Sequence, residues 1–220
     1  MPNLKDFSAI VFDLDGLVLD TEGSYFAAWK MAAAQMGFEL EDTFLKCLSG
    51  LHYQAVKQAI ATHCGEGFDV DEFTQRSGLC WHQHVQLTGI DVKPGFNEVL
   101  NWVKRQSIPF CLATNSHSDN ARQCLALAHI HGIFDVIIGR ELVKQGKPAP
   151  DIFNYAADRL NAPIQTCLVL EDSLTGIKAA KSAGAISVFI PSCLPANREA
   201  VQLADYTLES LVQLLGLLND

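Results

Sequence analysis

The sequence lacks several features that define whole classes of proteins. Its 220 residues contain no run of about 18 apolar side chains, so no transmembrane helix is expected. Lysine and arginine number 16 against 25 aspartates and glutamates, and the basic residues form no dense cluster. Nucleic acids and anionic membrane surfaces are therefore not expected partners. Residues 1–7 hold no long apolar segment, so no signal peptide is expected either.

Paired cysteines are also missing. The seven cysteines are odd in number, scattered, and without a C-x-x-C pair: Cys47, Cys64, Cys80, Cys111, Cys124, Cys167 and Cys193. A disulfide framework or a structural zinc site is therefore not expected. This usage is typical of a reducing compartment, and we expect a cytoplasmic protein.

Three catalytic or nucleotide-binding motifs are absent as well. Neither G-x-x-x-x-G-K-[ST] nor G-x-G-x-x-G occurs, so no motif indicates the use of ATP or a dinucleotide. No G-x-S-x-G is present, which removes the nucleophile elbow of the serine hydrolases.

What the sequence does contain is a series of short, continuous apolar runs separated by helical patterns. The runs occupy residues 9–12, 110–113, 136–138, 167–170 and 186–190. Continuous apolar character is typical of strands buried on both faces of a parallel sheet. The helical patterns between and after these runs lie near 95–106, 118–129, 150–160, 173–184 and 209–218. Alternation of strand and helix predicts an α/β fold, a Rossmann-like parallel sheet with helices on both faces.

One region breaks this alternation. Between about Leu17 and Gly89 no convincing strand pattern occurs, and helical patterns lie near 21–36, 41–47, 51–63 and 70–86. We interpret residues 18–89 as an inserted α-helical cap domain and residues 1–17 and 90–220 as the α/β core. The connections near 16–19 and 89–94 would form a two-stranded hinge.

Polar side chains follow the predicted strands at the edge where ligands bind in open α/β sheets. They are Asp13 and Asp15 after the first strand, Thr114, Asn115 and Ser116 after the second, Lys147 after the third, and Glu171 and Asp172 after the fourth. Four carboxylates in one cleft repel one another, and an all-oxygen donor set suits Mg²⁺. A lysine, hydroxyls and loop N–H groups are phosphate ligands. The set therefore predicts Mg²⁺-assisted phosphoryl transfer.

A nucleophile is still needed, and a carboxylate can attack phosphorus to form an aspartyl-phosphate. Asp13, the first residue after the strand, is the best candidate. Asp15 lies two residues on, points to the same side of an extended chain, and could act as general acid and base. Gly16 would let the chain turn sharply into the cap.

Four segments resemble the motifs of the haloacid dehalogenase (HAD) superfamily, in order and at the family's spacing. Motif I corresponds to residues 12–22 (FDLDGLVLDTE), motif II to 113–116 (ATNS), motif III to 146–153 (GKPAPDIF) and motif IV to 170–180 (LEDSLTGIKAA). An insert between motifs I and II is similar to the helical-cap branch, which includes β-phosphoglucomutases and sugar-phosphate phosphatases.

The resemblance implies a role for each matching position. Asp13 would be the nucleophile and a Mg²⁺ ligand, and Asp15 the general acid/base with its backbone carbonyl on the metal. Thr114, with Asn115 and Ser116 beside it, would bind the phosphoryl group, and Lys147 would hold that group and Asp13 together. Asp172 would bind Mg²⁺ directly and Glu171 through water.

The resemblance also bears on the reaction. Haloacid dehalogenases lack the second aspartate of motif I, so Asp15 favours phosphate chemistry. β-Phosphoglucomutases carry a histidine at the position that Tyr25 occupies here. The absence of that histidine favours a phosphatase that acts on a small phosphorylated metabolite such as a sugar phosphate. A phosphomutase is the first alternative, and a non-catalytic binder of phosphorylated metabolites is the second. In the cap, the candidate substrate contacts are Glu22, Tyr25, Lys46 and His52. A monomer is compatible with the length.

Overall fold

The computed structural model describes residues 6–48 and 53–219, which fall into two compact units. The first, here called the core unit, contains the chain up to Asp20 and from Asp91 onward. The second, here called the helical insert, is Thr21–Ile90. The insert predicted from sequence spans 18–89. That it acts as a cap stays a prediction.

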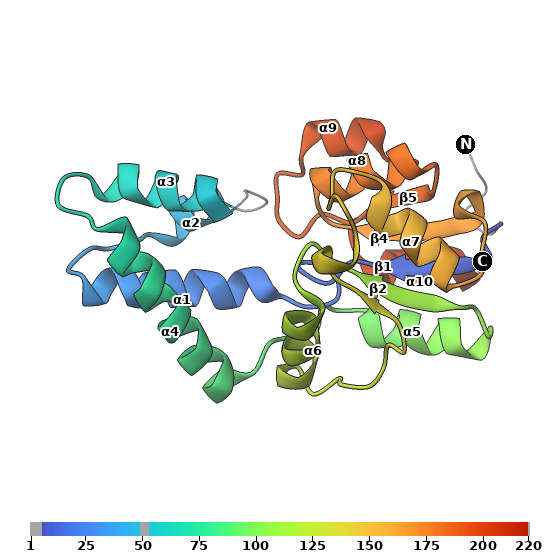
Figure 1. Ribbon diagram of the computed structural model, residues 1–220, viewed down its shortest axis with the longest axis horizontal. Coiled ribbons are helices and arrows are strands. Elements are labelled where there is room, and N and C mark those ends of the chain that lie inside the picture. The colour runs from blue at the N-terminus through green and yellow to red at the C-terminus, as the bar shows by residue number, and fades with distance from the viewer. Residues whose placement is uncertain (1–5, 49–52, 220) are drawn as a thin grey trace. The chain divides into compact units, whose positions relative to one another are not determined.

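The described part of the core unit is built on a six-stranded parallel sheet in the order β3-β2-β1-β4-β5-β6. Figure 1 labels β1, β2, β4 and β5 of this sheet. The strands are β1 (Ala9–Phe12), β2 (Phe110–Ala113), β3 (Ile137–Ile138), β4 (Cys167–Glu171), β5 (Ile186–Phe189) and β6 (Tyr206–Thr207). Val11 pairs with Cys111 on β2 and with Val169 on β4. The Rossmann-like α/β prediction is confirmed, and β6 is an addition that the apolar pattern did not predict.

Helices cover both faces of this sheet. They are α5 (Phe96–Arg105), α6 (Ser118–Leu127), α7 (Asp151–Arg159), α8 (Leu174–Ala183), α9 (Arg198–Leu203) and α10 (Leu211–Asn219), with short 3₁₀ turns η1 (Arg140–Leu142) and η2 (Ile164–Thr166). Val11 packs in one cluster with Phe153 of α7 and Ala180 of α8. Its neighbour Phe12 points to the opposite face, where its ring lies 5.7 Å from that of Phe96 of α5. Both faces are therefore buried, which explains the continuous apolar runs.

The helical insert contains α1 (Thr21–Gln35), α2 (Asp42–Lys46), α3 (Tyr53–Cys64) and α4 (Val70–Thr88). Helices α1 and α4 pack against each other through aromatic rings, with Tyr25 stacked against both Trp29 and Trp81. The indole N–H of Trp81 also donates a hydrogen bond of 2.9 Å to Ser24. This packing gives the insert a core of its own.

The two connections between the units run side by side within the core unit. Leu19 and Val92 form an antiparallel bridge. The amide of Asp20 donates to the carbonyl of Asp91 at 2.8 Å, and the amide of Lys93 donates to the carbonyl of Val18 at 2.9 Å. The chain thus leaves and re-enters the core unit at one place. Among residues 6–48 and 53–219, none of the helices is long and apolar enough to cross a membrane.

Candidate active site

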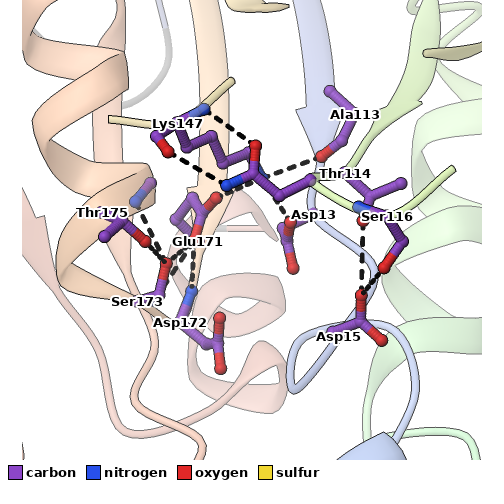
Figure 2. A network of polar contacts seen from close by, with 12 residues as sticks. Asp13, Asp15, Ala113, Thr114, Ser116, Lys147, Glu171, Asp172, Ser173 and Thr175 are labelled. Atoms are coloured by element: carbon purple, nitrogen blue, oxygen red, sulfur yellow. Dashed lines mark hydrogen bonds and ion pairs between the residues drawn. The ribbon is translucent and has the colours of Figure 1, made fainter. Parts of the chain in front are cut away.

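The strand topology brings the predicted site residues to one edge of the sheet. Asp13 follows β1, Thr114 follows β2, and Glu171 is the last residue of β4. Lys147 comes from the loop between η1 and α7. Because parallel strands end at the same edge, residues far apart in sequence become neighbours there (Figure 2).

Lys147 forms the centre of the site. Its ammonium group donates to Asp13, to Glu171 at 2.5 Å and to the backbone carbonyl of Ala113 at 2.9 Å. An ammonium group has three donors, and each has an acceptor here. Its side chain is 3% exposed and that of Glu171 is fully buried. The cation therefore bridges two buried carboxylates, a pairing that buried charges require.

Burial and charge act in opposite directions on these groups. Burial alone would lower the pKa of Lys147, but Asp13 and Glu171 hold that pKa above its ordinary value, so the lysine stays charged. Burial also raises the pKa of Asp13 well above its usual range, and the charge of Lys147 opposes this effect. Nearby carboxylates, Glu171 and Asp172 foremost, add to the rise.

Most of the hydrogen-bonding capacity of Glu171 is used within the protein. One oxygen binds Lys147, and the other accepts from the amide of Asp172 at 3.1 Å and from the amide and hydroxyl of Ser173 at 3.2 and 3.0 Å. A carboxylate offers about four acceptor positions, two on each oxygen; three donors share one oxygen here, and Lys147 occupies one position on the other. Glu171 thus fixes Lys147 and the first turn of α8.

Asp13, Glu171 and Asp172 form a group that could hold a metal ion. One carboxylate oxygen of each lies within 4.8 Å of the others. The oxygen of Asp13 that is not bound to Lys147 points toward the side where Asp172 lies (Figure 2). A compact, all-oxygen, acidic donor set has the chemistry that Mg²⁺ prefers. The side chain of Asp15 is not a member of this group, although the resemblance implied a backbone contact for that residue.

Asp15 is instead held by the hydroxyls of the second strand end. Its Oδ2 accepts from Thr114 at 3.3 Å and from Ser116 at 3.1 Å. Thr114 also accepts from the amide of Ser116 at 3.0 Å. The cap of α6 is His117, whose ring nitrogen accepts from the amide of Asp119. Thr114 and Ser116 are therefore not ordinary helix caps; they position a carboxyl group beside the site.

Asn115 faces the backbone of Lys147. Its amide nitrogen donates to the carbonyl of Lys147 at 3.1 Å, and its oxygen accepts from the amide of Lys147 at 2.8 Å. The sequence predicted a phosphate contact for Asn115, as for Thr114 and Ser116, and those contacts stay predictions.

Sequence reasoning did not identify two supporting groups. The Ala113 carbonyl is an acceptor for Lys147, and the Ser173 hydroxyl links Glu171 to the amide of Gly176 at 3.1 Å. A backbone carbonyl carries no signal in a sequence. The serine does, because a Ser directly before a helical pattern is a typical N-cap.

The candidate substrate contacts lie in the helical insert. Glu22 and Tyr25 are on α1, and Tyr25 belongs to the aromatic stack with Trp29 and Trp81. Lys46 is the exposed last residue of α2. His52 lies outside the described residues. A role in substrate binding stays a prediction for all four.

A parallel α/β sheet with a lysine, paired aspartates and an acidic metal-type cluster at its carboxyl edge defines an enzyme of phosphoryl-transfer type. Comparison with known proteins gives the family: residues 7–184 match the model of the haloacid dehalogenase-like hydrolases. The chain belongs to this family of enzymes, as the four motifs predicted.

Named relatives include both mutases and phosphatases. β-Phosphoglucomutase of Bacillus subtilis is 31% identical, over 92% of this chain and 93% of its own. The phosphorylated carbohydrates phosphatase of Thermotoga maritima is 29% identical, over 80% and 81%. The crystal structure of a HAD family hydrolase from Deinococcus radiodurans, with bound phosphate and sodium, has a TM-score of 0.78 and 25% identity, covering 97% of this chain and 98% of that one.

Proposed function

We propose that the protein hydrolyses a small phosphate monoester, a sugar phosphate or similar metabolite, through a phospho-Asp13 intermediate and with Mg²⁺ bound. The observation that carries the proposal is the buried Asp13–Lys147–Glu171 bridge with Asp15 two residues beyond the nucleophile. The phosphatase among the relatives, which acts on phosphorylated carbohydrates, supports this substrate class.

The acidic donor set supports a Mg²⁺ site held by Asp13 and Asp172, with the backbone carbonyl of Asp15. Glu171, whose oxygens already bind protein donors, would act through water, as the resemblance implies. When bound, the cation neutralises carboxylates and the charge of the phosphoryl group. Lys147 adds a second positive charge on the other oxygen of Asp13.

In the first step, a carboxylate oxygen of Asp13 attacks phosphorus. The ester P–O bond breaks, and the leaving oxygen takes a proton from Asp15. In the second step, the Asp15 carboxylate takes a proton from water. The water oxygen attacks phosphorus, the bond to Asp13 breaks, and inorganic phosphate leaves. In this proposal Lys147, Thr114 and Ser116 bind the phosphoryl oxygens, each exchanging a protein acceptor that it contacts here for the substrate.

Steady-state hydrolysis of p-nitrophenyl phosphate and a panel of sugar phosphates tests the proposal. We expect turnover that needs Mg²⁺ and falls at least about 1,000-fold in Asp13→Asn, because the nucleophile is lost. The exposed Asp135, in the loop before β3, provides a matched Asp135→Asn control that keeps its activity. The phosphatase proposal would be overturned if, on every substrate tested, the wild type had no more Mg²⁺-dependent activity than Asp13→Asn.

A phosphomutase is the second candidate, favoured by the 31% identity to the B. subtilis enzyme. Tyr25 argues against it, because its ring is stacked with two tryptophans and offers no imidazole. Product analysis on hexose 1-phosphates separates the two reactions. Free phosphate supports the phosphatase, and an isomeric hexose phosphate supports the mutase.

A further inference from the structure

We infer that Asn115 acts on the reaction through Lys147 and is a positioning residue, not a ligand of the phosphoryl group. The inference rests on the proposed function, since it concerns the lysine that would hold that group. It assigns the side chain a role that neither the motif resemblance nor the neighbouring hydroxyls indicate.

The first observation is the two-point contact between this side chain and one backbone residue. The carboxamide of Asn115 donates to the Lys147 carbonyl and accepts from the Lys147 amide, at 3.1 and 2.8 Å. A planar amide bonded at both ends to one residue fixes both the distance and the orientation of that backbone, as a strand partner would.

The second observation is that the residue before Lys147 makes room for this contact. A Cβ atom added at Gly146 would lie 2.5 Å from Oδ1 of Asn115 and would also overlap Cδ of Arg140. A side chain at position 146 would therefore have to displace the Asn115 carboxamide, the Arg140 side chain or both. The missing side chain at Gly146 therefore leaves the space in which Asn115 contacts the Lys147 backbone.

The third observation is that one short segment holds both ends of the lysine. The carbonyl of Ala113 accepts from Nζ at 2.9 Å, while Asn115, two residues on, holds the backbone. A lysine side chain has many rotamers, and it loses conformational entropy when it is held in one of them. Fixing its backbone beside its ammonium acceptors keeps Nζ between Asp13 and Glu171, where a small displacement would be costly to the rate.

A double-mutant cycle tests the route through Lys147. We expect Asn115→Ala to lower kcat/KM for p-nitrophenyl phosphate about 10- to 100-fold, as loss of an orienting partner does. In a Lys147→Ala background the same change should cost less than about threefold. Asn154→Ala, an exposed asparagine on α7, is the matched control and should leave activity unchanged. Equal losses in both backgrounds would overturn the inference, because a direct phosphate ligand acts independently of the lysine.

Two further measurements avoid dependence on the weak activity of the double variant. Calorimetric binding of inorganic phosphate in the presence of Mg²⁺ should weaken in Asn115→Ala, yet be the same in Lys147→Ala with and without Asn115→Ala. Gly146→Ala, which removes no polar group, should reproduce the loss seen in Asn115→Ala and add nothing to it. A fully active Gly146→Ala would contradict the claim that Gly146 leaves space for the contact between Asn115 and Lys147.

The controls separate this inference from the proposed function. A wild-type protein that neither turns over phosphate esters nor binds phosphate contradicts the function itself. If the wild type is active and Asn115→Ala lowers kcat/KM by the same factor with and without Lys147, only the positioning role is contradicted.

Discussion

At the residue scale, the contacts of the carboxyl groups explain which parts of the site the sequence could predict. Motif spacing and the strand ends predicted which residues meet, because strand topology decides that. They did not predict that the Glu171 carboxylate accepts hydrogen bonds from Lys147, Asp172 and Ser173. They also did not predict that the Asp15 carboxylate accepts hydrogen bonds from two hydroxyl groups. Such partners depend on side-chain rotamers and on loop backbone, which a pattern of residue types does not contain.

Gly16 gives a residue-scale prediction about the metal. Its φ of +85° suits glycine, and a Cβ there would overlap the carboxylate of Asp172. We expect Gly16→Ala to raise the Mg²⁺ concentration needed for half-maximal activity at least about tenfold, because it displaces a proposed ligand. Titration of activity with Mg²⁺, and calorimetry of Mg²⁺ binding, measure this shift.

The matched control for that experiment is Gly132→Ala. Gly132 has a φ of +74°, and among the described residues none beyond its two chain neighbours has a heavy atom within 4 Å of a Cβ built there. It carries a similar backbone strain of about 1–2 kcal/mol without the overlap. An equal shift in both variants would mean that strain, rather than displacement of Asp172, causes the effect.

At the element scale, the sequence predicted the strands that are buried on both faces of the sheet. The five apolar runs became β1 to β5, because strands covered on both faces must be continuously apolar. Strand β6 was not predicted, since Tyr206 is half-buried, Thr207 is exposed, and the two form no apolar run. Helix α9 was also not predicted, because it is only six residues long and too short to show a helical pattern of apolar residues.

A polar contact, rather than an apolar pattern, positions β6. Asp205, the residue before it, accepts from the amide and hydroxyl of Ser187 on β5, both at 2.9 Å, and from Lys181 of α8 at 2.6 Å. Ser187 is fully buried. A serine within an otherwise apolar strand was therefore the signal in the sequence, because a buried hydroxyl needs a partner.

This contact predicts a pH-dependent loss of stability in Asp205→Asn. Burial alone would raise the pKa of Asp205, but the hydrogen bonds from Lys181 and Ser187 hold it below its ordinary value. A lowered pKa stabilises the fold above the unfolded-state pKa of about 3.9, and the gain is lost as pH falls through the folded-state pKa. We expect a loss of about 1–2 kcal/mol in the free energy of unfolding at pH 7.

Urea unfolding at pH 7 and at successively lower pH measures it. The difference between Asp205→Asn and the wild type should shrink once the pH passes below about 4. The exposed Asp158 on α7 supplies Asp158→Asn as a control, with little change at either pH. A difference that stays constant with pH would show that shape, and not the charge of Asp205, is responsible.

At the scale of the whole molecule, the division into two units separates the proposed chemistry from the proposed selection of substrate. Every strand of the described sheet and each residue predicted to act in catalysis, phosphate binding or metal binding, from Asp13 to Asp172, belongs to the core unit. The insert joins that unit where Asp20 and Asp91 are hydrogen-bonded to each other. The helical pattern predicted the insert, but patterns of hydrophobicity give no ligand, so its substrate contacts stay predictions.

Replacing Thr21–Ile90 with an Asn-Gly turn tests this separation. Because the amide of Asp20 already bonds to the carbonyl of Asp91, a two-residue turn can close the chain there. We expect the shortened chain to unfold cooperatively in urea, to bind Mg²⁺ and inorganic phosphate, and to hydrolyse p-nitrophenyl phosphate. We also expect the spread of kcat/KM across a sugar-phosphate panel to narrow about tenfold or more, since discrimination needs contacts beyond the phosphoryl group. A folded, active variant with an unchanged spread would place substrate selection in the core unit, and Asp13→Asn in the same background confirms that the residual turnover comes from the proposed site.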